Sequence, residues 1–303
     1  MKKVSVILTT YNGESSVDQV IDSILTQEGI NQKFKIQLIV VDDCSTDNTL
    51  KIARKYDDAV VLTTKENSGG PNKGRNIGLR KVTGDYICIA DQDDVWKKHK
   101  LISVLPHLEK VPVVTSGYTL INYSNEKKID RNCENESGSI YFEKNRTFFS
   151  KLTKSLKGQN VYLGSIVYRK ELNHILFEEV FGLIDYDWVL RIFYGRDSIE
   201  VCDSLYTRYV DGQNLSLDPF YRRVDYYYSL FFVERYMNEY PKEVKISMQR
   251  IHGSRARYFY LVGDMKNARA YFLRSQLNWK TVLYYFTTFI GSSFVKKHFN
   301  VFG

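Results

Sequence analysis

The segment 86–94 ends an apolar run with three aspartates in four positions. The run "YICIA" is followed directly by Asp91, then by Asp93 and Asp94. Like charges this close repel one another unless water or a cation lies among them. Carboxylate oxygens are the ligands that Mg²⁺ and Mn²⁺ favour. The cluster therefore predicts either a solvated loop or a divalent metal site of the kind that neutralises phosphate groups.

Two earlier apolar runs also end in side chains that could bind a ligand. "VSVILTT" contains Thr9 and leads into Tyr11, and "IQLIVVD" ends in Asp42 and is followed by Asp43. Ligands of an open parallel sheet bind outside the carboxyl ends of its strands, so we expect these residues and the three aspartates to lie at one edge. Asp42 is expected to bond the local backbone instead of a ligand.

Apolar runs of strand length alternate with helical periods over the first 120 residues. Such near-continuous runs are typical of parallel strands that are covered on both faces. Apolar residues at helical spacing lie between the first two runs, and capping residues open a second helical period after the next run. The alternation predicts an α/β protein with a doubly wound, mostly parallel, Rossmann-like sheet. The runs occupy residues 4–10, 36–42, 59–64, 86–90 and 111–116.

Composition limits the class of protein, the number of domains and the compartment. A chain of 303 residues can form one large domain or two modest ones, and 43% apolar with 26% charged residues is typical of a folded protein. The four cysteines are far apart and form no C-x-x-C, which argues against a zinc site and a disulfide framework. This predicts a reducing cytoplasm. The polar stretch 122–138 predicts a surface excursion.

Four segments together resemble the family 2 glycosyltransferases of the GT-A fold. They are "VSVILTTYN", "IVVDDCSTDNT", "NKGRNIGLRKVTGDYICIADQDDVW" and "GLIDYDWVLR", in this order. The resemblance covers roughly residues 3–215 and implies a glycosyltransferase domain over 1–215. Within it, 1–120 would bind the nucleotide-sugar and 121–215 would supply the acceptor site and the catalytic base. Residues 216–303 form a helical, basic and aromatic C-terminal region.

The resemblance also implies roles for individual residues. The donor is expected to be a nucleotide-diphospho-sugar, with UDP-sugars favoured. In the D-x-D motif, Asp93 would be the direct ligand of Mn²⁺ or Mg²⁺, and Asp91 would face the ribose and the metal. The residues that the resemblance places on the nucleotide-sugar are Thr9, Tyr11, Asp43, Arg75, Asn76 and Asp91.

An inverting transfer also needs a carboxylate that accepts the proton of the attacking hydroxyl. The resemblance places this base at Asp185, with Asp187 as its nearest rival, although Asp185 could instead cap the following helix. Two positions depart from the family pattern. Ile184 stands where a glutamate is usual, and Asp211 stands where relatives often have a histidine.

The implied enzyme is a non-processive, metal-dependent glycosyltransferase. Its acceptor would be a hydroxyl of a glycan or lipid-linked saccharide, in the synthesis of a capsule, O-antigen or teichoic-type polymer. No Q-x-x-R-W motif is present, which argues against a processive synthase, and no nucleic-acid partner is expected. One alternative is a sugar-phosphate nucleotidylyltransferase, but the turn "TYNGESS" has no basic residue for a triphosphate. The other is a non-catalytic scaffold with the same fold.

The C-terminal region carries the whole excess of positive charge. Residues 215–303 hold fourteen Lys/Arg and six Asp/Glu, and their balance of +8 equals that of the entire chain. The uncharged run 281–295 is shorter than the roughly 20 residues that a helix needs to cross a bilayer. Lys280, Lys296 and Lys297 flank it.

Aromatic rings and flanking lysines predict a helix that lies in the headgroup region of an anionic membrane. We therefore expect a cytoplasmic protein that is peripheral on the inner face of the cell membrane. In the alternative, the segment only packs against the preceding helices, since the sequence from residue 218 onward predicts helices alone.

Overall fold

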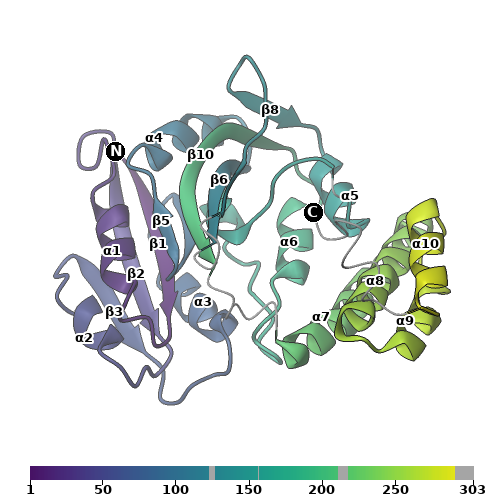
Figure 1. The fold of residues 1–303 in the computed structure, drawn as a ribbon. Helices are drawn as coiled ribbons and strands as arrows, with labels where there is room; N and C mark the ends of the chain where they lie inside the picture. The colour runs from purple at the N-terminus through teal and green to yellow at the C-terminus, as the bar shows by residue number, and fades with distance from the viewer. Residues whose placement is uncertain (123–126, 156, 211–217, 291–303) are drawn as a thin grey trace. The chain divides into compact units, whose positions relative to one another are not determined.

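The chain folds into two compact units (Figure 1). The computed structural model describes residues 1–122, 127–155, 157–210 and 218–290. The first unit comprises residues 1–148 and 157–221, and the second comprises 149–156 and 222–303. The short segment 149–156, which the sequence analysis assigns to the first domain, thus belongs with the C-terminal helices.

A single mixed sheet forms the centre of the first unit. Among the described residues its path runs β3-β2-β1-β4-β9-β6-β10-β5, with β7 paired to β6 and β8 paired to β10. The strands are β1 (Lys2–Thr10), β2 (Phe34–Asp42), β3 (Ala59–Thr63), β4 (Tyr86–Asp91), β5 (Asp94–Trp96), β6 (Val113–Asn122), β7 (Lys127–Arg131), β8 (Ser139–Phe142), β9 (Val167–Arg169) and β10 (Ser198–Val210).

The four strands β3, β2, β1 and β4 are parallel, as the sequence predicts. Their register pairs Thr9 with Asp91 and Thr10 with Asp42, so three strands end at the same edge of the sheet. The predicted fifth strand, β6, is separated from β4 by the short antiparallel strand β9. The sheet therefore has a parallel half that presents strand ends and a mixed half beside it.

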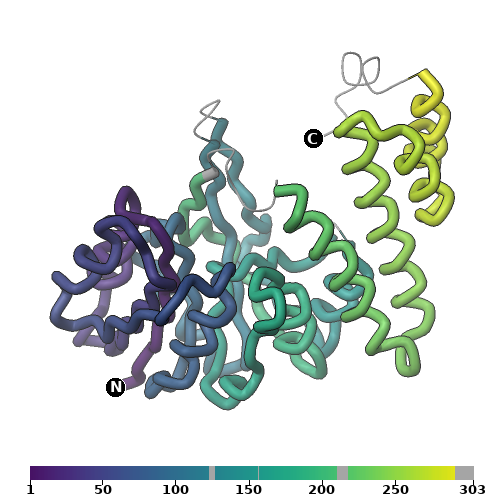
Figure 2. The backbone as a smooth tube through the Cα atoms, turned by 90° about the horizontal axis from the view of Figure 1, so that it is seen from below, coloured from purple at the N-terminus to yellow at the C-terminus, as the bar shows by residue number. Residues whose placement is uncertain are grey.

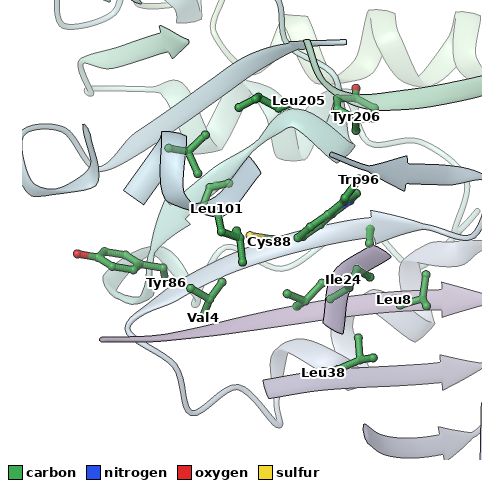
Figure 3. Packing of buried hydrophobic residues seen from close by; sticks show 14 of the residues in the cluster. Val4, Leu8, Ile24, Leu38, Tyr86, Cys88, Trp96, Leu101, Leu205 and Tyr206 are labelled. Carbon is green, nitrogen blue, oxygen red and sulfur yellow. The ribbon is translucent and has the colours of Figure 1, made fainter. Parts of the chain in front are cut away.

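Helices cover both faces of the parallel half. Leu8 of β1 packs in one apolar cluster with Ile24 of α1 (Figure 3). Ile7 points to the other face, where α3 approaches so closely that a Cβ on Gly78 would lie 2.5 Å from Ile7 Cγ2. Alternation of side chains along β1 thus gives both layers. The helices of the first unit are α1 (Val17–Leu25), α2 (Thr49–Ala53), α3 (Pro71–Leu79), α4 (Lys100–Val104) and α6 (Tyr186–Phe193). Helix α5 (Arg146–Leu152) begins in the first unit and continues into the segment 149–156 of the second.

The described part of the chain beyond residue 218 is helical, as predicted (Figure 2). Helix α8 ends at Gly263, whose φ of 86° is the left-handed conformation that suits a helix C-terminus. Asp264 then caps α9, because its side chain accepts a hydrogen bond from the Asn267 backbone. The helices are α7 (Pro219–Glu234), α8 (Pro241–Val262), α9 (Met265–Phe272) and α10 (Trp279–Thr287).

The expectation that no cysteines pair is wrong. Cys133 and Cys202 form a disulfide across 69 residues of sequence. Strands β7 and β10 both pair with β6, and a Cβ on Gly117 of β6 would lie 2.6 Å from Asn132 Oδ1 and 2.9 Å from the Asp203 carbonyl oxygen, in the residues next to the two cysteines. Cysteine spacing holds no information about such a pairing, so the argument from spacing for a reducing compartment fails.

Cys88 is a free, buried cysteine, and part of the polar stretch 122–138 forms a strand. Cys88 is buried in β4, where burial raises the pKa of its thiol to about 12, as suits an inert core residue. The stretch 122–138 was expected to be a surface excursion, yet 127–131 forms β7, which pairs with β6.

Candidate active site

A cleft of about 1070 Å³ lies at the carboxyl ends of the parallel strands. The end of β1, the loop before α3 and the residues around β4 and β5 form its walls. A volume of this size is in the range of small-molecule sites. Six of the eight residues that the sequence predicts for the site line this cleft, namely Thr9, Tyr11, Asp43, Arg75, Asp91 and Asp93.

Gln92 fixes the backbone of Tyr11. The Tyr11 N–H donates to Gln92 Oε1 at 2.8 Å, and Gln92 Nε2 donates to the Tyr11 carbonyl at 3.0 Å. The side chain thereby continues the β1–β4 pairing beyond the last paired residues. From the sequence alone, residue 92 is only the spacer of D-x-D, and the amide at this position is the signal for its role.

Asp43 holds the loop that precedes α3. Its carboxylate accepts hydrogen bonds from Thr64 Oγ1 at 2.9 Å, from the Ser68 backbone at 3.0 Å and from Ser68 Oγ at 2.8 Å. Asp42 is fully buried and accepts from the Ser45 backbone at 3.0 Å, which confirms its predicted structural role. The two neighbouring acids therefore differ, because only Asp43 lines the cleft.

Arg75 and Asp91 form an ion pair in the wall of the cleft. Arg75 Nη2 donates to Asp91 Oδ1 at 2.8 Å, with the Asp91 side chain 35% exposed. The guanidinium lies 5.3 Å from the ring centroid of Phe177, a cation–π distance. Arg75 is thus held rigidly and supplies positive charge beside the acids, although it is almost completely buried.

Asn76 does not line the cleft within the described part of the chain. Its Nδ2 donates to the Phe177 carbonyl at 2.9 Å and to Glu179 Oε1 at 2.6 Å, and its Oδ1 accepts from the Phe177 N–H at 2.8 Å. Both ends of the amide are therefore used within the protein. The structure gives Asn76 a bridging role between α3 and the segment that leads to α6, so we do not propose it as a nucleotide contact.

The three aspartates of the opening motif occupy different environments. Asp94 is buried in β5, and burial raises its pKa well above the usual value. The charges of Asp91 and Asp93 raise the pKa of Asp94 further, while those of Arg208 and Lys100 lower it. Burial also lowers the pKa of Lys100, to about 8. Asp91 and Asp93 are left as the two acids of the motif that line the cleft.

These two carboxylates fit a metal that is shared with a ligand. Among the described residues, no group of three or more His, Cys, Asp or Glu side chains could hold a metal ion alone. Mg²⁺ is commonly bound by one or two carboxylates together with phosphates of the substrate. Asp91 and Asp93 supply that number of carboxylates at a cleft large enough for the ligand.

Asp185 occupies the N-cap position of α6, and its side chain is partly exposed. It makes no capping hydrogen bond to α6, all of whose residues are described, so the alternative that it only caps the helix lacks support. It follows Leu183, which lines the cleft, by two residues. Asp187 is buried, accepts a hydrogen bond from Arg191 Nε at 2.7 Å and forms an ion pair with Arg191 Nη2 at 2.7 Å, which gives it a structural role. Asp211 lies outside the described residues.

The fold and the cleft define an α/β protein with a cleft at the carboxyl ends of its parallel strands, where sheets of this kind bind ligands. Residues 5–181, more than half of the chain, match the model of the family described as "Glycosyl transferase family 2". The chain therefore belongs to this family, as the motifs predict.

Individual relatives match shorter stretches. A stretch of 104 residues is 39% identical to "Poly(ribitol-phosphate) beta-N-acetylglucosaminyltransferase TarS" of Staphylococcus aureus and covers 33% of this chain and 18% of TarS. A stretch of 122 residues is 33% identical to "UDP-Glc:alpha-D-GlcNAc-diphosphoundecaprenol beta-1,3-glucosyltransferase WfgD" of Escherichia coli, covering 39% of this chain and 47% of WfgD. The chain thus matches less than half of either relative's length.

The fold is also that of a solved structure. The crystal structure of S. aureus TarS 1-349 in complex with UDP-GlcNAc superimposes with a TM-score of 0.67 and 22% identity, over 90% of this chain and 82% of that chain. At this identity the likeness establishes a common GT-A fold, which the sequence analysis expected.

Proposed function

We propose that this protein is a metal-dependent, inverting, non-processive glycosyltransferase that uses a UDP-sugar. The observation that carries the proposal is the gathering of Thr9, Tyr11, Asp43, Asp91 and Asp93 around one cleft at the strand ends. The names of the relatives support the choice of donor, because WfgD is named for UDP-Glc and the TarS structure is titled as a complex with UDP-GlcNAc.

The donor would lie along the strand ends. The Tyr11 side chain is 44% exposed and offers a ring face for the base, while Gln92 fixes its backbone. Asp91 and Asp93 would hold Mn²⁺ or Mg²⁺. When bound, such an ion neutralises the charge that develops on the departing nucleoside diphosphate. Arg75 adds a fixed positive charge to the same wall.

Asp185 would act on the acceptor. Its carboxylate accepts the proton of the acceptor hydroxyl while the hydroxyl oxygen attacks the anomeric carbon opposite the diphosphate. The new bond joins that oxygen to the anomeric carbon, and the bond to the diphosphate breaks with its electron pair. Attack from the opposite face inverts the configuration at the sugar.

The acceptor class is a hydroxyl of a glycan or lipid-linked saccharide in cell-surface polysaccharide synthesis. TarS and the beta-glucosyltransferase of Bacillus spizizenii are named for poly(ribitol-phosphate), and WfgD for a diphosphoundecaprenol-linked saccharide. We infer an acceptor of this kind from these names.

A thermal-shift panel of nucleotide-sugars, with and without Mn²⁺, tests the proposed function. UDP-glucose and UDP-GlcNAc should raise the melting temperature more with Mn²⁺ than without it, and the protein should release UDP from at least one UDP-sugar. Binding of UTP without any UDP-sugar turnover would favour a nucleotidylyltransferase. Binding of no nucleotide would favour a non-catalytic scaffold.

We also propose that the second unit attaches to the surface of an anionic membrane. One side of α10 packs inward, because the Tyr260 hydroxyl donates to Thr287 Oγ1 at 2.9 Å and Tyr284 stacks on Phe272. The opposite side carries large apolar side chains at helical spacing. This exposed stripe is formed by Trp279 (71% exposed), Leu283 (40%) and Phe286 (64%) of α10 and by Ile290 (66%) in the turn that follows it.

Charge favours a lipid surface as the partner of this stripe. Lys280 lies in α10 beside Trp279, and residues 215–303 carry the entire net charge of +8. Aromatic rings and basic side chains both interact favourably with the headgroup region of anionic lipids. Within the described residues, no helix has the length and apolar character that a transmembrane passage requires. Lys296 and Lys297 lie outside the described residues. The inner face of the cell membrane would bring the enzyme to a lipid-linked acceptor.

Flotation with lipid vesicles tests this attachment. Wild-type protein should float with vesicles that contain anionic lipid, and far less with neutral ones. The double variant Trp279→Ser/Phe286→Ser should lose most of this binding, whereas Val180→Ser, which changes an exposed valine of the first unit, should not. If all samples stay equally in the soluble fraction, the proposal is wrong. It is also wrong if the double variant differs from wild type only in being a monomer where wild type is a dimer.

A further inference from the structure

Asn72 is a fully buried polar residue in the first turn of α3. Its Nδ2 donates to the carbonyl of Glu178 at 2.8 Å and to the carbonyl of Ile184 at 3.0 Å. Its Oδ1 accepts from Arg75 Nη1 at 2.9 Å. Both donor bonds of the side chain thus go to the segment before α6, and its oxygen binds Arg75 of the same helix. Buried amides with this many partners are costly to alter.

One end of this arrangement reaches the metal-binding motif. The same guanidinium that bonds Asn72 donates through its other terminal nitrogen to Asp91 Oδ1 at 2.8 Å. Arg75 is therefore held by hydrogen bonds from both terminal nitrogens, and its position next to Asp91 depends on the oxygen of Asn72. A planar guanidinium with two fixed partners transmits orientation better than a flexible ammonium does.

The other end reaches the segment that presents the base. Ile184, whose carbonyl Asn72 binds, directly precedes Asp185. The backbone of Asn72 also donates to the Gly182 carbonyl at 3.1 Å. A Cβ on Gly70 would lie 2.4 Å from that carbonyl oxygen, so the two chain segments are in close contact. The loop before α6 is thereby held against the start of α3.

We propose that Asn72 is a positioning residue that holds the cleft and the segment carrying Asp185 in a fixed relation. It acts through Arg75 on Asp91 and through the Ile184 carbonyl on Asp185. The inference rests on the proposed function, since it takes Asp185 as the base. A general base must lie within hydrogen-bond reach of the proton that it accepts, and a shift of about 1 Å can cost on the order of 10²-fold in rate.

Two substitutions separate the ends of the arrangement. Asn72→Asp keeps an oxygen for Arg75 but removes both donors to the carbonyls, and Asn72→Ala removes all three bonds. With UDP-GlcNAc or UDP-glucose, Mn²⁺ and water as the acceptor, both variants should release UDP with a kcat lowered by about 10- to 100-fold. In Asn72→Asp the Kd for UDP with Mn²⁺ should stay within about threefold of wild type, because an oxygen for Arg75 remains. Asn72→Ala should weaken UDP binding further, because Arg75 loses its partner beside Asp91.

Asn173→Ala is the matched control. Asn173 Nδ2 donates to the Leu79 carbonyl at 3.1 Å and so ties an earlier part of the same segment to the end of α3, farther from the base in sequence. This variant should lower the melting temperature while its kcat stays close to that of wild type. A purely structural role for Asn72 would instead lower the stability of both proteins and leave the kcat of the folded fraction unchanged.

The outcomes are distinguishable from a failure of the proposed function. If wild-type protein neither binds UDP nor releases it from a UDP-sugar, the proposed function fails and this inference with it. If wild type is active and the folded Asn72→Ala and Asn72→Asp proteins keep their kcat, only the inference on Asn72 is overturned. Circular dichroism and the melting temperature show which variants are folded. If one of the two variants does not fold, the kcat of the other tests the inference.

Discussion

Asp93→Asn should abolish Mn²⁺-dependent binding of UDP and of UDP-sugars while leaving the fold intact. Asp91 and Asp93 are the two motif acids at the cleft, and the proposed site needs both carboxylates. An asparagine keeps the shape but removes the charge that attracts the cation. The substitution also removes one of the charges that raise the pKa of Asp94, so it relieves repulsion among the acids.

Calorimetric titration of UDP with and without Mn²⁺ measures this effect. Wild type should bind UDP more tightly with the metal, and the variant should bind with the same low affinity in both conditions, at an unchanged melting temperature. Asp58→Asn, which removes the same charge from an exposed position between α2 and β3, serves as the control. If Asp93→Asn keeps a normal rate of metal-dependent turnover, the assignment of Asp93 as a metal ligand is wrong.

Asp185→Asn should keep the affinity for the donor near normal yet lower the rate of transfer by a large factor. A general base contributes on the order of 10²- to 10⁴-fold and acts only in the transition state. The amide preserves size but does not accept the proton. Steady-state release of UDP gives kcat, and titration with UDP gives the affinity, so the two effects separate in one set of proteins.

Asp187→Asn is the informative comparison. Asp187 is bound by two nitrogens of Arg191, so its replacement should reduce the stability of α6, with transfer by the folded protein retained. The reverse pattern, in which Asp185→Asn transfers normally and folded Asp187→Asn does not, would show that the base is assigned to the wrong residue.

The parallel half of the fold was predictable from sequence because its strands are buried on both faces. Such strands are continuous apolar runs, and the residues that follow them must lie at the carboxyl edge. This is why Thr9, Tyr11, Asp43 and Asp91 line one cleft, as the motifs predict. The insertion of β9 between β4 and β6 was not predictable, because a three-residue strand carries no periodic signal.

Contacts made by single polar side chains were the least predictable. Gln92, Asn72 and Asn76 each bind backbone groups of a distant segment, and nothing in the local pattern shows which segment that is. The same holds for Cys133, which follows β7, and Cys202, which lies in β10, two strands that pair with β6. Periodicity predicts which face of an element is buried, but these partners follow from the tertiary arrangement.

The two hydrogen bonds between Gln92 and the Tyr11 backbone limit which residues can occupy positions 13 and 92. A Cβ on Gly13 would lie 2.5 Å from Gln92 Oε1, so a larger residue at 13 displaces the glutamine. A shorter side chain at 92 would leave the Tyr11 backbone without its partner and open space over the glycine. Positions 13 and 92 should therefore change together among relatives.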